Sequence, residues 1–376
     1  MTSYDIQSMS FRLLCIAALA VLLSVSDAAA QGIPVTNAQM RAQAGWDALR
    51  EGRHQDAADA FAAALAVAPR DPTLHVGAGL ASYLIGQIAT AQQSLERALV
   101  LSPSFTAASL LLGDILHRNN EVDAAIRVFE AALEYAPGDK TLASRLQRAR
   151  QESELHSGFF QSQGAHFTVL FEGPSDEELS RRVLDVLEAA YWRVGTALLT
   201  FPERIIPVVL YTEQQFRDIT RSPGWAAAAY DGRIRVPVRG ALTNPDELDR
   251  VLTHEFTHAL VQSVAPRGVP TWLNEGLAVV FEPRGPAWVD AQLGSSRDRL
   301  PLQRLADGFE RLSGAQARIA YAQSGGAVRA LIEQAGAPAM VALLQDIGRG
   351  DAFEAAFERR MMTTYASFAA SLDPSR

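Results

Sequence analysis

Residues 244–264, which read NPDELDRVLTHEFTHALVQSV, predict a helix that carries the chemistry of the second half of the chain. Asn244 can cap a helix, and Pro245 suits the first helical position because no hydrogen-bonded amide is needed there. Acidic side chains follow in the first turn, where the positive end of the helix dipole favours them. The segment is therefore expected to be helical through the motif HEFTH at 254–258.

Two histidines within this helix indicate a metal site. His254 and His258 lie four residues apart, so they project from successive turns of one face and both imidazoles can meet one small ion. Glu255 lies about 100° round the helix from His254, where its carboxylate can reach a metal-bound water without binding the metal. The alternative is a pair of ordinary helix histidines, but the motif on a well-started helix favours the metal site.

An open catalytic zinc site needs a third protein ligand. The segment PTWLNEGLA at 270–278 begins a second helix, and its Glu275, seventeen residues beyond His258, is the candidate. Asn274 and Glu282 are polar rivals nearby. Three neutral or anionic nitrogen and oxygen ligands suit Zn²⁺ with one open position, so one zinc ion per chain is expected.

A motif His-Glu-x-x-His followed by a second helix with a glutamate resembles the gluzincin group of zinc peptidases. The run WLNEGLA looks especially like the peptidase-MA-like bacterial family, which often follows tetratricopeptide repeats, and the resemblance covers about residues 163–370. It implies that His254, His258 and Glu275 bind the metal. It also implies that Glu255 is the catalytic acid/base.

The mechanism implied by this resemblance needs two further groups. Gluzincins often carry an aspartate four residues after the third ligand, where it orients a ligand histidine; here that position is Val279, so the orienting group must lie elsewhere. The developing oxyanion needs a donor besides zinc. Tyr321 is the candidate, and Tyr230 and His166 are weaker ones. A packed core aromatic is an equally good interpretation of Tyr321.

The first part of the chain is repetitive. Pro69, Pro103 and Pro137 recur every 34 residues, at the ends of FAAALAVAP, LERALVLSP and FEAALEYAP. The same spacing relates glycines, alanines and large apolar residues, namely Gly45, Gly79 and Gly113; Ala57, Ala91 and Ala125; and Phe61, Leu95 and Phe129. This resembles the tetratricopeptide repeat, a helical hairpin in which small residues let two helices approach closely. Three repeats and a capping helix are expected over residues 38–155.

Stacks of such repeats usually present a concave surface to a peptide or protein partner. The alternative is that this stack only spaces or solubilises the domain behind it, because alanine-rich helices with few aromatic residues offer little by which to select a partner. The sequence leaves both interpretations open.

A different pattern begins after the stretch SGFFQSQG at 157–164. Strand patterns occupy residues 166–171 and 205–211, and helical spacing occupies 175–199 and 301–372. The fold class expected for the chain is therefore α+β. It has an N-terminal all-α solenoid, followed at about residues 163–372 by a zincin-type mixed sheet, active-site helices and a C-terminal helical subdomain.

A hairpin is expected where Asp231-Gly232 separates two extended runs. In the second run, residues 233–238, apolar residues alternate with arginines and Pro237. Proline within a strand indicates a sheet edge, and such an edge can bind an extended peptide by strand addition. Equally, this run could merely close the sheet.

The N-terminus has the features of a secretory signal. Arg12 precedes the apolar run 13–25, and Ala28-Ala29-Ala30 supplies a small-x-small cleavage site, so residues 1–30 are expected to be removed. An uncleaved anchor is the alternative, although the run is short for a membrane span. The mature protein is thus expected in the periplasm or outside the cell, with no stable membrane span.

The composition narrows the function classes. The net charge of −8 argues against nucleic acid as a partner, because nucleic acid demands clustered cations. Cys15, the only cysteine, lies in the signal segment, which excludes a thiol nucleophile from the mature chain. The leading expectation is a zinc-dependent peptidase acting on a peptide or protein. The alternatives are a non-catalytic interaction scaffold and a hydrolase of a non-peptide amide.

Overall fold

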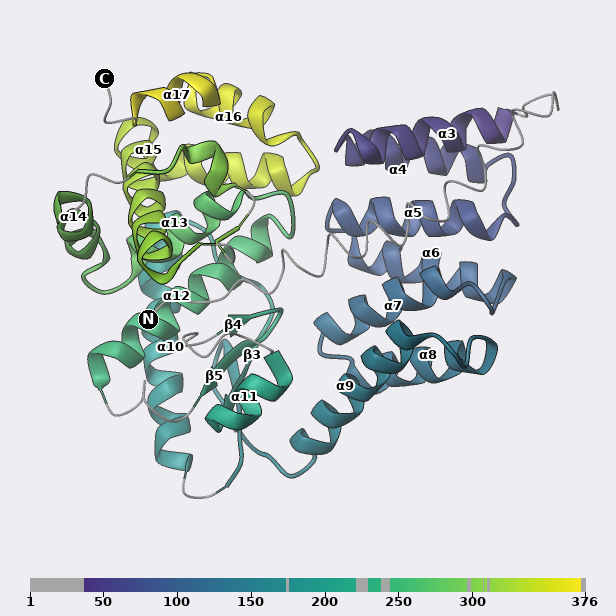
Figure 1. Cartoon of the computed structure of the whole chain (residues 1–376), viewed down its shortest axis with the longest axis horizontal. Coiled ribbons are helices and arrows are strands. Elements are labelled where there is room, and N and C mark those ends of the chain that lie inside the picture. The colour runs from purple at the N-terminus through teal and green to yellow at the C-terminus, as the bar shows by residue number, and fades with distance from the viewer. Residues whose placement is uncertain are drawn as a thin grey trace. The chain divides into compact units, whose positions relative to one another are not determined.

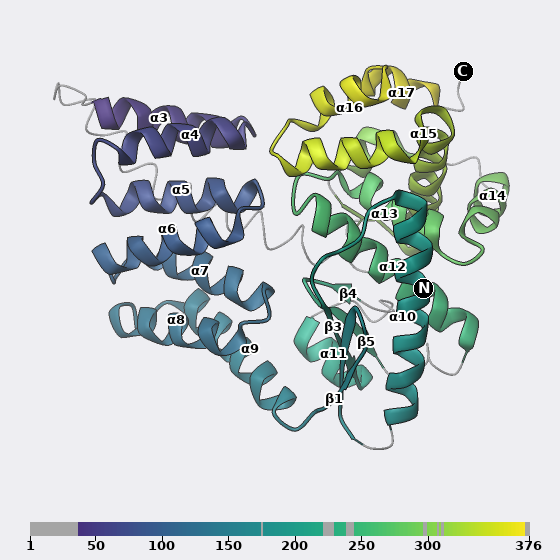
Figure 2. The same ribbon diagram turned by 180° about the vertical axis from the view of Figure 1, so that it is seen from behind.

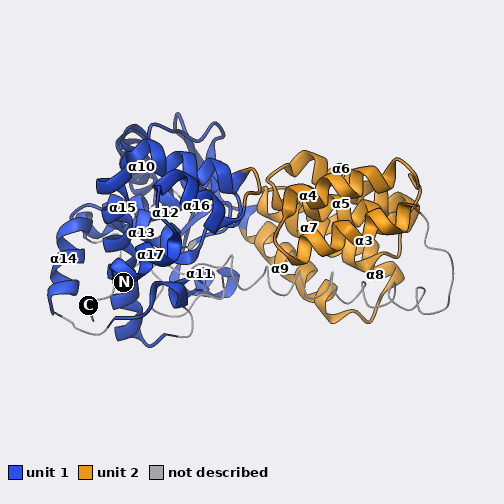
Figure 3. Ribbon diagram, turned by 90° about the horizontal axis from the view of Figure 1, so that it is seen from above, with its two compact units in different colours: residues 1–8, 156–348, 352–376 blue, residues 9–155, 349–351 orange. Residues whose placement is uncertain are grey.

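The structure is a computed structural model that describes residues 37–173, 176–220, 229–237, 244–295, 299–306, 308–309 and 312–372. The segment 1–30, interpreted above as a secretory signal, lies outside the described residues. Within them the chain divides into two compact units, residues 37–155 with 349–351 and residues 156–348 with 352–372 (Figure 3).

The first unit is helical throughout its described part. Its helices follow one another along the chain in the order α3 (Asn37–Arg50), α4 (His54–Leu65), α5 (Pro72–Leu84), α6 (Ile88–Leu101), α7 (Thr106–Arg118), α8 (Val122–Tyr135) and α9 (Lys140–His156) (Figure 1). The first six form the three expected hairpins, and α9 follows them as the expected capping helix does. The predicted all-α solenoid is confirmed.

The close approach of the two helices in a hairpin depends on a glycine that faces a large side chain. A Cβ atom on Gly113 would lie 2.3 Å from the Phe129 ring, and one on Gly79 would lie 2.8 Å from Leu95. Phe129 and Leu95 are themselves buried in the core of this unit. The 34-residue period therefore has a physical cause: in each hairpin a small residue on one helix packs against a large residue on the other.

The second unit contains a five-stranded mixed sheet in the order β1-β2-β3-β5-β4. Strands β1, β3, β4 and β5 are labelled in Figure 2. Its strands are β1 (Phe160–Gln163), β2 (Phe167–Phe171), β3 (Ile206–Tyr211), β4 (Ala229–Tyr230) and β5 (Ile234–Pro237). β2, β3 and β5 are parallel to one another, whereas β1 and β4 are antiparallel to their neighbours. The hairpin expected around Asp231-Gly232 is present as β4 and β5.

Two details of the sheet differ from the sequence analysis. β1 lies in the stretch interpreted as the domain boundary, and its mostly exposed side chains give it no apolar alternation. The run beginning at Arg233 is not at the edge of the described sheet, because β5 pairs with β3 on one side and β4 on the other. Arg233 and Arg235 are buried rather than solvated. Arg235 donates to the Asp231 carboxylate at 3.0 Å and to the Tyr211 hydroxyl at 2.6 Å.

Helices surround this sheet and extend beyond it, which confirms the predicted α+β class. They are α10 (Glu177–Leu198), α11 (Glu213–Thr220), α12 (Pro245–Val264), α13 (Thr271–Phe281), α14 (Gly285–Ser295), the short 3-10 helix η2 (Leu302–Leu305), α15 (Gly314–Gly348), α16 (Phe353–Met361) and α17 (Tyr365–Ser371). One core joins the sheet to α10 and α12, and a second joins α13 to the C-terminal helices. Because α12 contributes Phe256 to the first core and Val261 to the second, it is buried between them.

Helix α15 is long and apolar enough, by length and composition alone, to cross a membrane. Gly336 interrupts it with φ 81° and ψ 161°, two residues before Pro338. Side chains on both sides of the interruption, among them Leu331 and Leu344, pack in the second core. A core helix needs the same apolar composition.

Candidate metal centre

Helix α12 begins as its sequence predicts. The Asn244 side chain accepts the backbone N–H of Asp246 at 3.1 Å, and Pro245 occupies the first turn. Phe256 turns into the sheet core, which leaves another face of the helix for His254 and His258. Their ring centres lie 4.8 Å apart. The spacing of four residues therefore brings two imidazoles together at one place.

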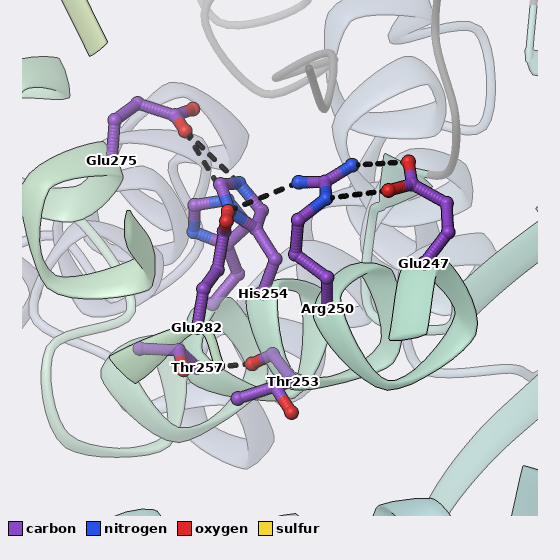
Figure 4. A network of polar contacts seen from close by, with 8 residues as sticks. Glu247, Arg250, Thr253, His254, Thr257, Glu275 and Glu282 are labelled. Atoms are coloured by element: carbon purple, nitrogen blue, oxygen red, sulfur yellow. Dashed lines mark hydrogen bonds and ion pairs between the residues drawn. The ribbon is translucent and has the colours of Figure 1, made fainter. Parts of the chain in front are cut away.

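Glu275 approaches these imidazoles from α13. Its Oε2 lies 3.3 Å from Nε2 of His254 and 3.5 Å from Nε2 of His258 (Figure 4). Helix α13 can pack closely on α15 because Gly276 has no side chain, and a Cβ atom there would lie 2.4 Å from the Ser324 carbonyl oxygen. Helix packing thus holds Glu275 over the two histidines.

The three groups fit a metal ion. One ligand atom from each lies within 4.8 Å of the others, and all three side chains are buried. Apart from their approach to one another, the two Nε2 atoms and the Glu275 Oε2 atom form no hydrogen bond with a described residue. Two imidazoles and one carboxylate are a donor set that suits Zn²⁺ with an open position. Buried polar atoms that converge without hydrogen bonds are what a metal site requires.

The charges around these atoms also favour a bound cation. Burial alone would lower the pKa of His254, but the Glu275 and Glu282 carboxylates outweigh it and raise that pKa to about 10. Burial would raise the pKa of Glu275, whereas His258 and His254 lower it to about 2. The carboxylates therefore stabilise positive charge at this point, either a proton on an imidazole or a metal ion.

Glu282 is a functional candidate whose place the sequence analysis did not identify. It was considered as a rival ligand, but its Oε1 accepts a hydrogen bond from Nδ1 of His254 at 2.6 Å, on the side of the ring away from Glu275 (Figure 4). Arg250 also donates to Oε1 of Glu282 at 3.2 Å. Glu282 lies just beyond the last residue of α13, so helical spacing from Glu275 does not place it, and no sequence signal indicated its contact with His254.

A cleft of about 520 Å³ opens beside this cluster. His254, Glu282, Trp288 and Tyr321 all contribute to its wall, together with the first turns of α12. The Tyr321 ring centre lies 6.4 Å from that of His254, so the structure places this candidate donor at the cleft. Glu255 is buried, with 1% of its surface exposed, on the same helix as both histidines.

The two weaker candidates for an oxyanion donor are not among the described residues that line the cleft. His166 stacks on Tyr191 with ring centres 3.7 Å apart, and its Nδ1 hydrogen-bonds Glu188 at 2.6 Å. Tyr230 lies in β4, where burial and the Asp231 charge hold the pKa of its hydroxyl well above the usual value. His166 is therefore engaged by Tyr191 and Glu188, and Tyr230 is part of the sheet.

Matches to known protein families agree with the division of the chain into a repeat unit and a second unit. Residues 210–368 match the Peptidase MA superfamily, and residues 43–87 and 85–140 match the tetratricopeptide repeat. Among solved structures, the chain is similar to the "First TPR of Spaghetti (RPAP3) bound to HSP90 peptide SRMEEVD", with 20% identity, a TM-score of 0.31, and coverage of 32% of this chain and 99% of that one. No curated protein matches the chain. The predicted arrangement, tetratricopeptide repeats followed by a peptidase-MA-type domain, is confirmed.

Proposed function

We propose that this chain, in which tetratricopeptide repeats precede a Peptidase MA superfamily domain, is an exported zinc-dependent peptidase with one zinc ion per chain. The observation that carries the proposal is the buried cluster of His254, His258 and Glu275, with ligand atoms within 4.8 Å of one another. His254 of this cluster lines the cleft, which supports the approach of a substrate from that side.

The Nε2 atoms of His254 and His258 and the Glu275 carboxylate would hold the zinc ion. When bound there, zinc supplies a Lewis acid that polarises the scissile carbonyl and lowers the pKa of a water molecule. Glu255, buried on the same helix, acts as general base and takes a proton from the attacking water. It then delivers that proton to the leaving amine nitrogen as the carbon–nitrogen bond breaks.

Tyr321 is the proposed donor to the carbonyl oxygen as negative charge develops on it. The tyrosine is 3% exposed and packs edge-on against Phe309 with ring centres 5.0 Å apart, so its ring is held in place at the cleft wall. A donor that is already oriented stabilises the transition state more than one that must be ordered during the reaction.

The repeats are proposed to bind a peptide or protein, either the substrate itself or a partner that delivers it. This role follows from the repeat architecture, which stacks hairpins into an extended surface. The signal-like segment at residues 1–30 supports the proposed location in the periplasm or outside the cell.

Metal analysis combined with a peptide-library cleavage assay tests the proposal. Mature protein purified without chelators is expected to contain one equivalent of zinc and to hydrolyse library peptides. A chelator should abolish cleavage, and added zinc should restore it. Absence of stoichiometric zinc would refute the metal site. Stoichiometric zinc without cleavage of any peptide would replace the peptidase with a scaffold or with a hydrolase of a non-peptide amide.

A further inference from the structure

The position from which gluzincins often orient a ligand histidine is unavailable in this chain. Val279, four residues after Glu275, is buried and belongs to the core between α13 and the C-terminal helices. Its Cγ1 lies 3.0 Å from where a Cβ atom on Gly325 of α15 would stand. A carboxylate at residue 279 would therefore displace core packing, and the orienting group must come from another place.

The end of α13 supplies that group. Helix α13 stops at Phe281, and Glu282 adopts φ −56° and ψ 145°, an extended conformation. Pro283 accounts for this ending, because proline disfavours helical backbone at the residue before it. The Glu282 side chain is 7% exposed and reaches α12, where it accepts a hydrogen bond from His254.

This contact fixes which nitrogen of His254 carries the proton. A carboxylate oxygen accepts hydrogen bonds, so Nδ1 of His254 is the donor across the 2.6 Å contact with Oε1 of Glu282. The lone pair of the neutral ring is then on Nε2, the atom that lies 3.3 Å from Glu275. Glu282 therefore presents His254 in the tautomer that a metal ion needs.

Arg250 holds Glu282, and Glu247 in turn holds Arg250 (Figure 4). Arg250, one helical turn before His254, donates through Nη1 to Glu282 at 3.2 Å and through Nη2 to Glu247 at 2.7 Å. The side-chain exposure falls along this series, from 28% at Glu247 and 22% at Arg250 to 7% at Glu282 and 3% at His254. The pairing with Arg250 offsets the penalty of burying the Glu282 carboxylate.

We infer that Glu282, Arg250 and Glu247 form a positioning relay that orients His254 and strengthens zinc binding, in place of a carboxylate at residue 279. The inference rests on the proposed zinc site. It also decides between the two carboxylates that compete for the third ligand position, because Oε1 of Glu282 is already engaged by both His254 and Arg250. By contrast, Nδ1 of His258 has no hydrogen-bond partner among the described residues.

The relay is tested by the zinc affinity of the full mature chain, measured by competition with a chromogenic chelator. Glu282→Ala is expected to weaken zinc binding about 10- to 100-fold, the range found for outer-shell partners of metal ligands. Glu282→Gln keeps an acceptor oxygen but loses the charge, so its affinity should fall between those of Glu282→Ala and the wild type. Asp246→Ala is the matched control, because Asp246 borders the same cleft and pairs with Arg284 rather than with His254.

A spectroscopic measurement distinguishes positioning from a general loss of structure. In ¹⁵N spectra of the zinc-loaded chain, His254 should show a protonated Nδ1 whose signal shifts in Glu282→Gln, while the His258 signals stay in place. Equal zinc affinity in the wild type and both Glu282 variants would overturn the relay. So would a result in which Glu282→Gln loses zinc and Glu275→Gln keeps it, because Glu282 would then be the ligand. A wild type that binds no zinc would instead refute the proposed function. If Glu282→Ala does not fold, Glu282→Gln, which keeps the side-chain volume, carries the test alone.

Discussion

The two units of the chain differ most in what they bury. Within the described residues of the repeat unit, Glu152 is the one buried side chain among the acidic and basic residues and histidines, and it pairs with His117 at 2.8 Å. Among the described residues of the second unit, the buried acidic, basic and histidine side chains are Arg233, Arg235, His254, Glu255, His258, Glu275, Glu282 and Asp346. Burying a charge is costly unless it is paired or coordinates a metal. The repeat unit largely avoids this penalty, whereas the second unit buries His254, His258, Glu275 and Glu282 together at the candidate metal centre.

Glutamine substitution of a buried glutamate in each unit should give the largest difference between the units, measured as peptidase activity. Glu255→Gln keeps the shape of the side chain but removes the proposed general base, so kcat/KM on a library-derived peptide should fall about 10²- to 10⁴-fold while zinc is retained. Glu152→Gln should leave kcat/KM on the same short peptide unchanged, since its partner His117 lies in the repeats.

Peptidase assays and metal analysis on both purified variants check this contrast. If Glu255→Gln loses its zinc, Glu255 is a ligand and its role as base is wrong. If Glu255→Gln keeps full activity, the general base lies elsewhere. Should Glu152→Gln reduce hydrolysis of a short peptide to a similar degree, buried charge in the repeats would have a catalytic part as well.

Alanine substitution of one tightly packed glycine in each unit should have an intermediate effect on stability, and in the second unit on zinc affinity as well. In Gly113→Ala the new methyl group would press on the Phe129 ring, and overpacking of this kind typically destabilises by about 1–3 kcal/mol. In Gly276→Ala it would meet the Ser324 carbonyl of α15, which is backbone and cannot rotate away. Helix α13 must then shift and carry Glu275 with it, so Gly276→Ala should lower both stability and zinc affinity.

Calorimetry and zinc titration of the two glycine variants measure both quantities. Gly113→Ala should retain the zinc affinity of the wild type. If Gly276→Ala also retains it, Glu275 is not held in place by the packing of α13 on α15, and the position of the third ligand has another cause.

The two units also differ in how much of their structure could be predicted from the sequence. The repeats were predictable because the same small and large residues recur three times at a spacing of 34 residues. The pairing of His254 with His258 was predictable from their spacing on one helix, and Glu275 was predictable through the resemblance of WLNEGLA to the peptidase-MA-like family. The relay through Glu282 was not, since its contact with His254 depends on where α13 ends and on contacts across 28 residues.

The sheet also has features that depend on tertiary contacts and could not be predicted from the sequence. Pro237 favoured a sheet edge, but β5 pairs on both sides, and Arg235 is buried with its guanidinium group bound by Asp231 and Tyr211. Periodicity reports which side chains differ in polarity, and it does not report which polar side chains will find buried partners. β1, whose side chains are mostly exposed, carries too weak a pattern to be recognised.

The smallest expected contrast concerns two helix caps built in the same way. Asp71 accepts the N–H of Thr73 at 2.8 Å and precedes Pro72 in the repeats, and Asn244 accepts the N–H of Asp246 at 3.1 Å and precedes Pro245 in the second unit. Replacing either cap by alanine should cost about 0.5–2 kcal/mol, because one backbone donor at the helix start loses its partner.

The two cap variants differ in which unit should lose stability and whether zinc can compensate. Asp71→Ala should lower the calorimetric transition of the repeats alone, and added zinc should not restore it. Asn244→Ala should lower the transition of the second unit, and added zinc should raise that transition again, because a ligand that binds only the folded state stabilises it in proportion to RT ln(1 + [L]/Kd). If Asp71→Ala shifts both transitions equally, the units unfold as one cooperative body and the repeats contribute directly to the stability of the metal site. That coupling would leave the difference in buried charge in place, but it would mean that the repeat unit, which buries few charged side chains, stabilises the unit that holds the candidate metal centre.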